Sequence, residues 1–348
     1  MKHPTFLMFT ILVILMACMS TPTPLPSSTA TPSASPSVSP SASPITTDTP
    51  TPTDTPMPTG TQGNCIIAPP DMVAWWAMDD AAGLSSTTII DNSAGGHTGN
   101  LLDTALGPVA IGSAPGGTVV VSVPPGGAWP GSVLFPQAGN ALFFVRTFAL
   151  VGSNPVFDIG QNGLTITLWF NTAGAITPIQ PLLDKWDVNS NSGYSLYLDS
   201  WDGNNKTYAL KFNLNNTVIA FPTPIPSPTS PGNFPWYFVA VTVQNNGAAT
   251  LYINSPNSQV PSSLQGATYT GSVASWQVSN TVPIGIAGNR SLLPPILSGN
   301  NPYRSAIGGY AAAELALDEV EIFNRALNLT TEIQNLYNLE SQGVQKCQ

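Results

Sequence analysis

The sequence predicts an all-β fold, an antiparallel sandwich of two sheets that ends in one short helix. Two observations carry this prediction. Short runs rich in Val, Ile, Phe, Tyr and Trp recur through residues 65–348, with apolar and polar positions alternating and with Gly, Asn or Pro at their ends. Helical spacing of apolar residues, in contrast, is clear only close to the C-terminus. We therefore expect one folded domain over residues 65–348.

Residues 1–18 are similar to a lipoprotein signal peptide. A basic start precedes an apolar run, Phe6 to Ala17, which is too short to span a membrane as a helix. Leu15-Met16-Ala17-Cys18 resembles a lipobox, although Met16 replaces the usual small residue. The resemblance implies that Cys18 carries lipid, that the protein is exported to the cell surface, and that it contacts the membrane through this anchor only. The alternative is a cleaved signal with an incidental cysteine.

Residues 19–64 are almost wholly Thr, Pro, Ser and Ala, a composition that cannot bury a core. Proline at this density favours extended polyproline II, so the segment predicts a disordered stalk that reaches on the order of 100 Å. Its hydroxyl groups offer attachment points for O-linked sugar, but a solvated linker needs none.

The folded part begins with a predicted strand at Val73–Met78, whose Trp76 we assign to the core. A proline-rich tract, Phe221–Pro235, must run over the surface as a loop, because proline cannot serve an inner ladder. Further strands are predicted at Thr118–Val123, Ala141–Arg146, Thr165–Phe170, Tyr194–Leu198, Tyr208–Leu214, Tyr237–Val243, Thr250–Ile253 and Val282–Ile286.

The last strand and the helix follow each other directly. Alternation over Leu315–Phe323 predicts a strand with Asp318, Val320 and Ile322 on one face and with Leu317, Glu319, Glu321 and Phe323 on the other. After a turn at Asn324-Arg325, an apolar stripe predicts a short helix with Asn328 as its N-cap. The stripe consists of Leu329, Ile333, Leu336 and Tyr337.

The string from Asp318 to Tyr337, D-E-V-E-I-F-N-R-A-L followed by E-I-Q-N-L-Y, resembles the closing segment of laminin G-like, concanavalin A-like jelly-roll domains of bacterial surface proteins. The resemblance extends in family order to earlier segments: Val73–Asp80, Asp91–His97, Gly139–Phe143, Leu164–Phe170, Leu183–Leu198, Trp236–Val243 and Leu251–Asn254. It implies a jelly roll in which the first and last strands are neighbours.

Cys65 and Cys347 flank this domain. An exported pair of cysteines invites a disulfide, and the resemblance brings the two ends of the domain close together. Closing a loop of this length stabilises by about 4 to 5 kcal/mol in the chain-entropy treatment. The alternative is two free thiols.

Composition excludes several classes of function. A net charge of −9, with only nine Lys and Arg residues, argues against nucleic acid and anionic membrane surfaces as partners. The sequence contains no G-x-S-x-G, no H-E-x-x-H and no phosphate-binding loop, and beyond the signal peptide its one histidine is His97, in a Gly-rich loop. We therefore expect no enzyme.

The enzymatic alternative is a laminarinase-like glycoside hydrolase, because Asp318-Glu319-Val320-Glu321 resembles the E-x-D-x-E motif of those enzymes. On a strand, however, the next position on the face of Glu319 and Glu321 is Phe323, so the second carboxylate is missing. We expect these two glutamates to lie at a solvated or ion-paired edge.

Asp318 is predicted to point towards the core, where a carboxylate needs a cation, a metal ion or several N–H donors. The family resemblance implies a structural calcium ion bound by Asp318 and Asp79. Alternatively, Arg325 pairs with Asp318 or Glu319 and fixes the corner between strand and helix. A second calcium candidate, residues 187–193, departs from an EF-hand loop and is predicted to be a hairpin loop.

Sugar binding uses aromatic rings that stack on a pyranose, with Asn or Asp side chains at the hydroxyls. The candidates that flank loops are Trp186, Asp187, Trp201, Asp202 and Trp276. The sequence therefore predicts a non-catalytic, surface-anchored module that recognises a glycan or a cell-surface protein. The alternative is a structural cell-envelope domain with a protein interface and no sugar site.

Overall fold

The computed structural model describes residues 71–78, 86–103, 119–123, 139–172, 179–187, 189–205, 207–226, 236–254, 265–268, 273, 275–289 and 311–341. All of them belong to the larger of two compact units, Asp54–Gln348. The predicted signal peptide with Cys18 and the stalk lie outside the described residues, as do Cys65, Cys347 and Asp79. The lipid anchor, the stalk and the disulfide therefore stay predictions.

The described chain is mostly β-strand. The strands are β1 (Met72–Trp76), β2 (Thr88–Ile89), β3 (Gly99–Asp103), β4 (Val119–Val123), β5 (Gly139–Val151), β6 (Leu164–Asn171), β7 (Gln180–Asp187), β8 (Ser192–Asp202), β9 (Thr207–Leu214), β10 (Thr217–Ala220), β11 (Ile225–Pro226), β12 (Trp236–Val243), β13 (Ala249–Asn254), β14 (Gln265–Thr268), β15 (Ile284–Ile286), β16 (Gly288–Asn289) and β17 (Ala311–Phe323). The helices are a 3-10 turn η1 (Pro155–Phe157), a π turn η3 (Leu329–Ile333) and α1 (Gln334–Ser341).

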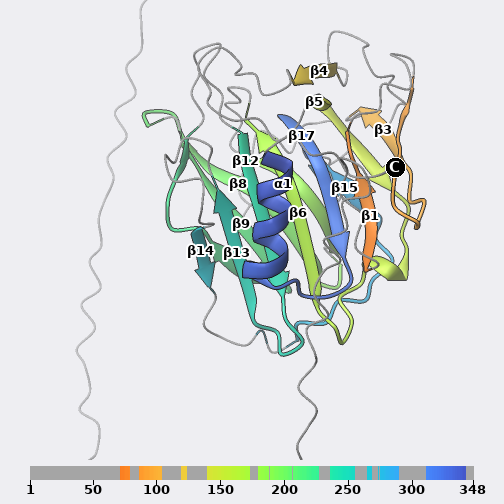
Figure 1. The fold of residues 1–348 in the computed structure, drawn as a ribbon, viewed down its shortest axis with the longest axis vertical. Helices are drawn as coiled ribbons and strands as arrows, with labels where there is room; N and C mark the ends of the chain where they lie inside the picture. The colour runs from red at the N-terminus through yellow and green to blue at the C-terminus, as the bar shows by residue number, and fades with distance from the viewer. Residues whose placement is uncertain are drawn as a thin grey trace, which may run out of the picture. The chain divides into compact units, whose positions relative to one another are not determined.

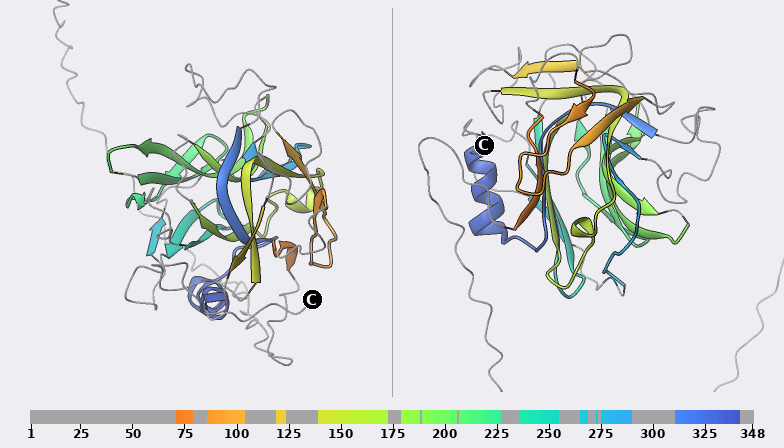
Figure 2. Two further views of the ribbon diagram at one scale, coloured as in Figure 1. Left: turned by 90° about the horizontal axis from the view of Figure 1, so that it is seen from above. Right: turned by 90° about the vertical axis from the view of Figure 1, so that its right-hand side faces the viewer.

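The strands form two layers (Figures 1 and 2). The first sheet runs β1-β17-β6-β12-β13-β14, and every neighbouring pair in it is antiparallel. The second sheet runs β15-β7-β8-β9, with β10 and β11 both paired to β9. The long strand β5 pairs with β17 at one end and with β15 at the other, so it joins the layers. The predicted antiparallel sandwich is confirmed, and so is the pairing of its first and last strands.

The main core lies between the two sheets, as strand alternation requires. On β6, Leu164, Ile166, Leu168 and Phe170 face the core, whereas the residues between them face outwards. Trp76 is fully buried in the same core, which confirms its assignment.

A β-bulge in β17 changes which side chains face that core. Glu319 has a positive φ of 47°, and the register with β6 shifts between Asp318 and Glu321. Because the extra residue reverses the alternation, Leu317 faces the core together with Val320 and Ile322. Asp318 lies opposite Trp169, on the outer face. The predicted side-chain orientation is therefore wrong for Leu317 and Asp318, which precede the bulge.

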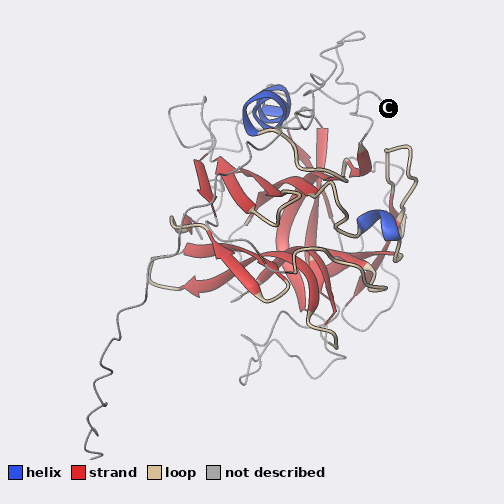
Figure 3. Ribbon diagram, turned by 90° about the horizontal axis from the view of Figure 1, so that it is seen from below, coloured by secondary structure: helices blue, strands red, loops and turns tan. Residues whose placement is uncertain are grey.

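The predicted C-terminal helix covers the outer face of the first sheet (Figure 3). Asn328 caps it by accepting hydrogen bonds from the backbone N–H groups of Thr330 and Thr331 (2.9 and 3.2 Å). The apolar stripe packs with Trp75, Trp169 and Trp236 in a second cluster, as the helical spacing predicted. In the described residues, no helix has the length and apolarity that crossing a membrane requires.

Candidate functional site

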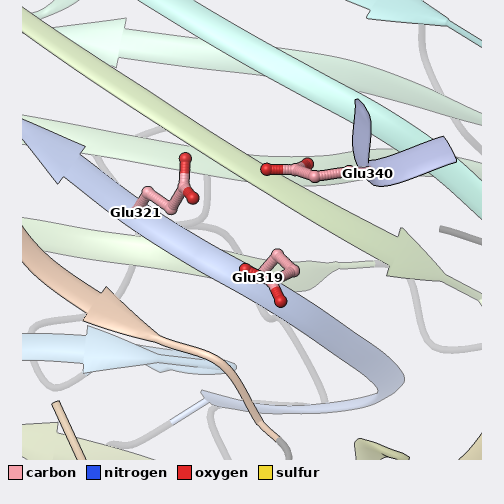
Figure 4. Close-up of side chains that lie close together, drawn as sticks. All are labelled: Glu319, Glu321 and Glu340. Carbon is pink, nitrogen blue, oxygen red and sulfur yellow. The ribbon is translucent and has the colours of Figure 1, made fainter. Parts of the chain in front are cut away.

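Three glutamates meet between the first sheet and α1 (Figure 4). Glu319 and Glu321 come from β17, and Glu340 comes from α1. One carboxylate oxygen of each residue lies within 4.8 Å of the others, and the residues are only 2%, 0% and 1% exposed. The prediction of a solvated or ion-paired edge at Glu319 and Glu321 is therefore wrong, because the helix packs over this face of the sheet.

Each of these carboxylates is tied to the first sheet by a donor on a strand that flanks β17. Trp75 Nε1 donates to Glu319 Oε2 (2.7 Å), Thr167 Oγ1 to Glu321 Oε2 (2.5 Å) and Trp169 Nε1 to Glu340 Oε2 (2.7 Å). A carboxylate has about four lone-pair sites, so each group has the capacity for more than one partner.

The arrangement suits an ion better than a substrate. Among the described residues, Glu319, Glu321 and Glu340 are a group whose oxygens are close enough to hold one cation, and oxygen ligands of this kind suit calcium. A two-carboxylate hydrolase also needs close carboxylates, about 5 to 5.5 Å apart for retention, but across an open cleft. Buried glutamates beneath a helix are closed to a glycosidic bond, so this geometry does not support hydrolysis.

The calcium pair expected from the resemblance is not assembled by the described residues. Asp318 is 2% exposed, its Oδ1 accepts the backbone N–H of Glu319 (3.0 Å), and it lies on the outer face of β17 instead of the core face. Asp79 lies outside the described residues. The calcium ion stays a prediction. The carboxylates that lie close enough together to hold one are those of Glu319, Glu321 and Glu340, not those of Asp79 and Asp318.

Arg325 fixes the corner between strand and helix, but with other partners than predicted. It pairs with Asp71 and with Glu332, whose oxygens lie 2.9 and 2.5 Å from the guanidinium nitrogens. Burial by itself raises the pKa of Glu332, yet its hydrogen bonds from Arg325 and from the Asn328 N–H outweigh this effect and lower it. The pairing of Arg325 with Asp318 or Glu319 is therefore wrong.

The residues predicted to bind a ligand do not form one group. Trp186 is fully buried, so it cannot flank an open loop as expected. Asp187 accepts hydrogen bonds from Asn189 N–H (3.0 Å) and from the Ser190 hydroxyl (2.7 Å), which lower its pKa and confirm the hairpin loop. Asp202 shapes the turn at the other end of β8. The 11 residues of β8 put the two turns roughly 35 Å apart.

Trp276 is the remaining candidate whose side chain the structure describes, since Trp201 has only its backbone in the described part. The Trp276 ring is half-buried and packs against Gly247, where a Cβ atom would lie 2.7 Å from Trp276 Cδ1. The ring also packs against the edge of the main core, and its neighbours in the chain, Ser275, Gln277 and Ser279, are exposed polar residues. We name these three residues together with the ring the Trp276 rim.

The Trp276 rim is held by polar residues that no motif marks. Asn215 accepts the Gly193 N–H (2.8 Å) and donates to the carbonyls of Ser275 and Gln277. Lys185 is fully buried, forms an ion pair with Asp158 (2.9 Å) and donates to Asn280 Oδ1 (2.7 Å). An alternating strand pattern cannot reveal such a lysine, because its partners lie in loops distant in sequence.

No protein-family model and no curated protein matches this chain. Solved structures do match in part. The binding domain of Paraclostridial Mosquitocidal Protein 1 is 16% identical over 77% of this chain and 52% of that chain, with a TM-score of 0.43. The Botulinum Neurotoxin serotype G binding domain is 12% identical over 77% of this chain and 51% of that chain, with a TM-score of 0.44. The chain thus spans about half the length of these proteins, and a likeness at this level carries no function to it.

Proposed function

We propose that the chain is a non-catalytic, cell-surface binding module of the laminin G-like type that recognises carbohydrate through the Trp276 rim. The observation that carries this proposal is a half-buried indole ring whose neighbours in the chain, Ser275, Gln277 and Ser279, expose amide and hydroxyl side chains. An aromatic ring offers a face to a pyranose, and amides and hydroxyls match its alternating donors and acceptors. The predicted lipid anchor and stalk would present this site away from the membrane.

The rim is also preorganised for binding. Asn215 links the turn between β9 and β10 to the segment around Trp276, and Asn280 donates to the Ser192 carbonyl at the start of β8 (3.1 Å). The buried Lys185 fixes Asn280 from below. A ligand therefore meets loops that are already ordered, and the entropy lost on binding is reduced.

The alternative of a protein interface receives less support. A contiguous exposed apolar patch would favour it. Within the described ranges, Ile90 is the exposed large apolar side chain, with 42% of its surface accessible, and a single side chain is no patch.

A glycan array probed with the full chain, with calcium and again with chelator, tests this proposal. We expect binding to neutral oligosaccharides, and a loss of at least tenfold in affinity for Trp276→Ala. Tyr252→Ala removes another half-buried aromatic ring, on the first sheet, and serves as the matched control without effect. Absence of glycan binding by the wild type would overturn the proposal, whereas loss only in chelator would support the calcium prediction.

A further inference from the structure

Lys185 carries an amine that is buried inside the sandwich. The residue lies on β7 opposite Tyr194, which belongs to the main core, and its side chain is fully buried. Complete burial is rare for lysine, because the ammonium group loses its hydration and must be paired. An amine held away from water is also a potential nucleophile, and sugar binding at the Trp276 rim does not use it. The groups around this amine decide what it can react with.

Three groups that suit one reaction meet at Lys185 Nζ. It donates to the side-chain Oδ1 of Asn280 at 2.7 Å and to the Asn280 backbone carbonyl at 2.9 Å. Asp158 Oδ1 lies 2.9 Å from Nζ, which makes an ion pair although the angles are not those of a hydrogen bond. An amine, an amide and a carboxylate that can move protons are therefore in contact, and they come from three distant segments of the chain.

We propose that Lys185 and Asn280 are a modification site, at which the two side chains form an intramolecular isopeptide bond with Asp158 as the proton carrier. One proton first passes from Lys185 Nζ to the Asp158 carboxylate. The ion pair becomes a neutral amine and a neutral carboxyl group, and this exchange removes two charges from a buried place and lowers the desolvation cost. The neutral amine is the nucleophilic form of lysine.

The amine then attacks Cγ of Asn280. This carbon lies one C=O bond of about 1.2 Å beyond Oδ1, and therefore within about 4 Å of Nζ. As the Nζ–Cγ bond forms, negative charge develops on Oδ1. The backbone N–H of Val282 already donates to that oxygen at 3.2 Å, so a donor for the developing charge is in place. The fold holds all of these groups together, and the reaction needs no encounter step.

The bond is completed when ammonia leaves. Asp158 gives its proton to Asn280 Nδ2 and takes one from the attacking nitrogen, and the Cγ–Nδ2 bond breaks. The departing ammonia takes the remaining proton from Asp158 as ammonium, which balances the charge of the lysine ammonium at the start. No oxidant or cofactor takes part. The Asp158 side chain is 17% exposed, so the released ammonium lies next to solvent.

The same amine has a second possible target, the Asp158 carboxyl group, with loss of water. The hydrogen bonds favour Asn280. Its Oδ1 accepts from two donors, Lys185 Nζ and the Val282 N–H, whereas Asp158 Oδ1 has no hydrogen-bond partner in the described part of the chain. The bond to Asn280 would fasten β7 to the segment that carries the Trp276 rim, 95 positions away along the chain.

Mass spectrometry of the full chain, unfolded in urea and digested with trypsin, tests the proposal. Trypsin does not cut after an acylated lysine, so we expect a branched product in which residues 147–206 are joined to residues 212–290. Its mass should be lower than the sum of the two peptides by one ammonia molecule. A cut after Lys185 and two separate peptides would overturn the proposal. A lost water confined to residues 147–206 would assign the bond to Asp158 and overturn it as well.

Three variants and a control test the roles of the residues. Lys185→Arg keeps the charge but removes the nucleophile, and Asn280→Ala removes the acyl group, so neither should give the branched product. Asp158→Ala should lower the branched fraction at least tenfold. Lys211→Arg is the matched control, because Lys211 also pairs with a carboxylate, that of Asp199, at 2.6 Å; it should keep the branched product in full. A full branched fraction in Asp158→Ala would overturn the role of Asp158. If a variant fails to fold, the wild-type digest still decides the proposal.

Discussion

The outer faces of the two sheets both bury polar groups, but they satisfy them differently. On the first sheet, Glu319, Glu321 and Glu340 each accept a hydrogen bond from a side chain of β1 or β6. On the second sheet, the side-chain amide of Asn213 and the hydroxyl of Tyr197 have no partner, and on the first sheet the same holds for the Trp236 Nε1. Polar groups that are tied in a network specify one packing arrangement, whereas buried groups without partners cost stability.

The covering elements reflect this difference. On the first sheet the network includes a side chain of the helix itself, and the Trp169 ring also stacks on Tyr337 of α1 at a centroid distance of 5.6 Å. Hydrogen bond and ring contact together give the helix one position on the sheet. We therefore interpret the first face as a structural joint.

The largest expected effect concerns the pH dependence of stability on the second face. The pKa of Asp184 rises from 3.8 to about 7 on folding because the carboxyl group is buried. Between pH 3.8 and about pH 7, the Asp184 carboxyl group therefore keeps its proton in the native state and has lost it in the unfolded state. This contribution to stability is fully present below pH 3.8 and is lost as the pH rises towards 7, by on the order of 4 kcal/mol. Urea unfolding from pH 4 to pH 8 measures it.

Two variants sharpen this prediction. Asp184→Asn should remove the fall in stability, because the amide does not titrate. Asp187 provides a control of opposite sign, since hydrogen bonds lower its pKa and its contribution is lost as the pH falls. If the free energy of unfolding of Asp184→Asn fell with pH as it does in the wild type, the Asp184 carboxyl group would not be the cause of the pH dependence.

A smaller effect on stability is expected from the hydrogen bond between Trp169 and Glu340 beneath α1. Trp169 and Trp236 are both buried in the cluster under the helix, but the Trp169 indole donates to Glu340 and the Trp236 Nε1 has no partner. Phenylalanine removes the N–H from either residue with a similar loss of volume. We expect Trp169→Phe to cost about 2 kcal/mol more than Trp236→Phe, because a hydrogen bond to a charged group is lost. Unfolding in guanidinium chloride measures both free energies. Equal losses of stability would show that the Trp169–Glu340 hydrogen bond contributes no more than the unpaired indole N–H of Trp236.

Local patterns were enough to predict most of the longer strands and the helix with its Asn328 cap, whereas the pairing of the first and last strands came from the family resemblance. Short strands such as β11 (Ile225–Pro226), which lies inside the proline tract predicted as a loop, were missed. Alternation and helical spacing are properties of neighbouring residues, so a single sequence displays them. The side-chain orientation in β17 was also predicted incorrectly. A positive φ at a glutamate has no sequence signal, and this one bulge reversed the predicted orientation of Leu317 and Asp318.

The sites were harder to predict because they combine distant segments. Glu340 joins Glu319 and Glu321 only after α1 packs on the sheet, so the sequence suggested a missing carboxylate where the fold supplies one. Trp186 was predicted to flank a loop, but both faces of β7 are covered and the ring is buried. The unsatisfied Asn213 appears as an ordinary outward residue of a strand until its surroundings are known.

The smallest expected effect lies at the edge of the first face, at the Arg325 corner. Arg325 joins Asp71, just before β1, to Glu332 in the turn that leads into α1, and its side chain is 32% exposed. Solvent screens ion pairs of this kind, so Arg325→Gln should cost about 1 kcal/mol, and the cost should shrink as sodium chloride is raised. Urea unfolding at low and high salt measures this. A cost as large as that of Trp169→Phe and independent of salt would mean that the corner, and not the buried Trp169–Glu340 bond, fastens the helix to the sheet.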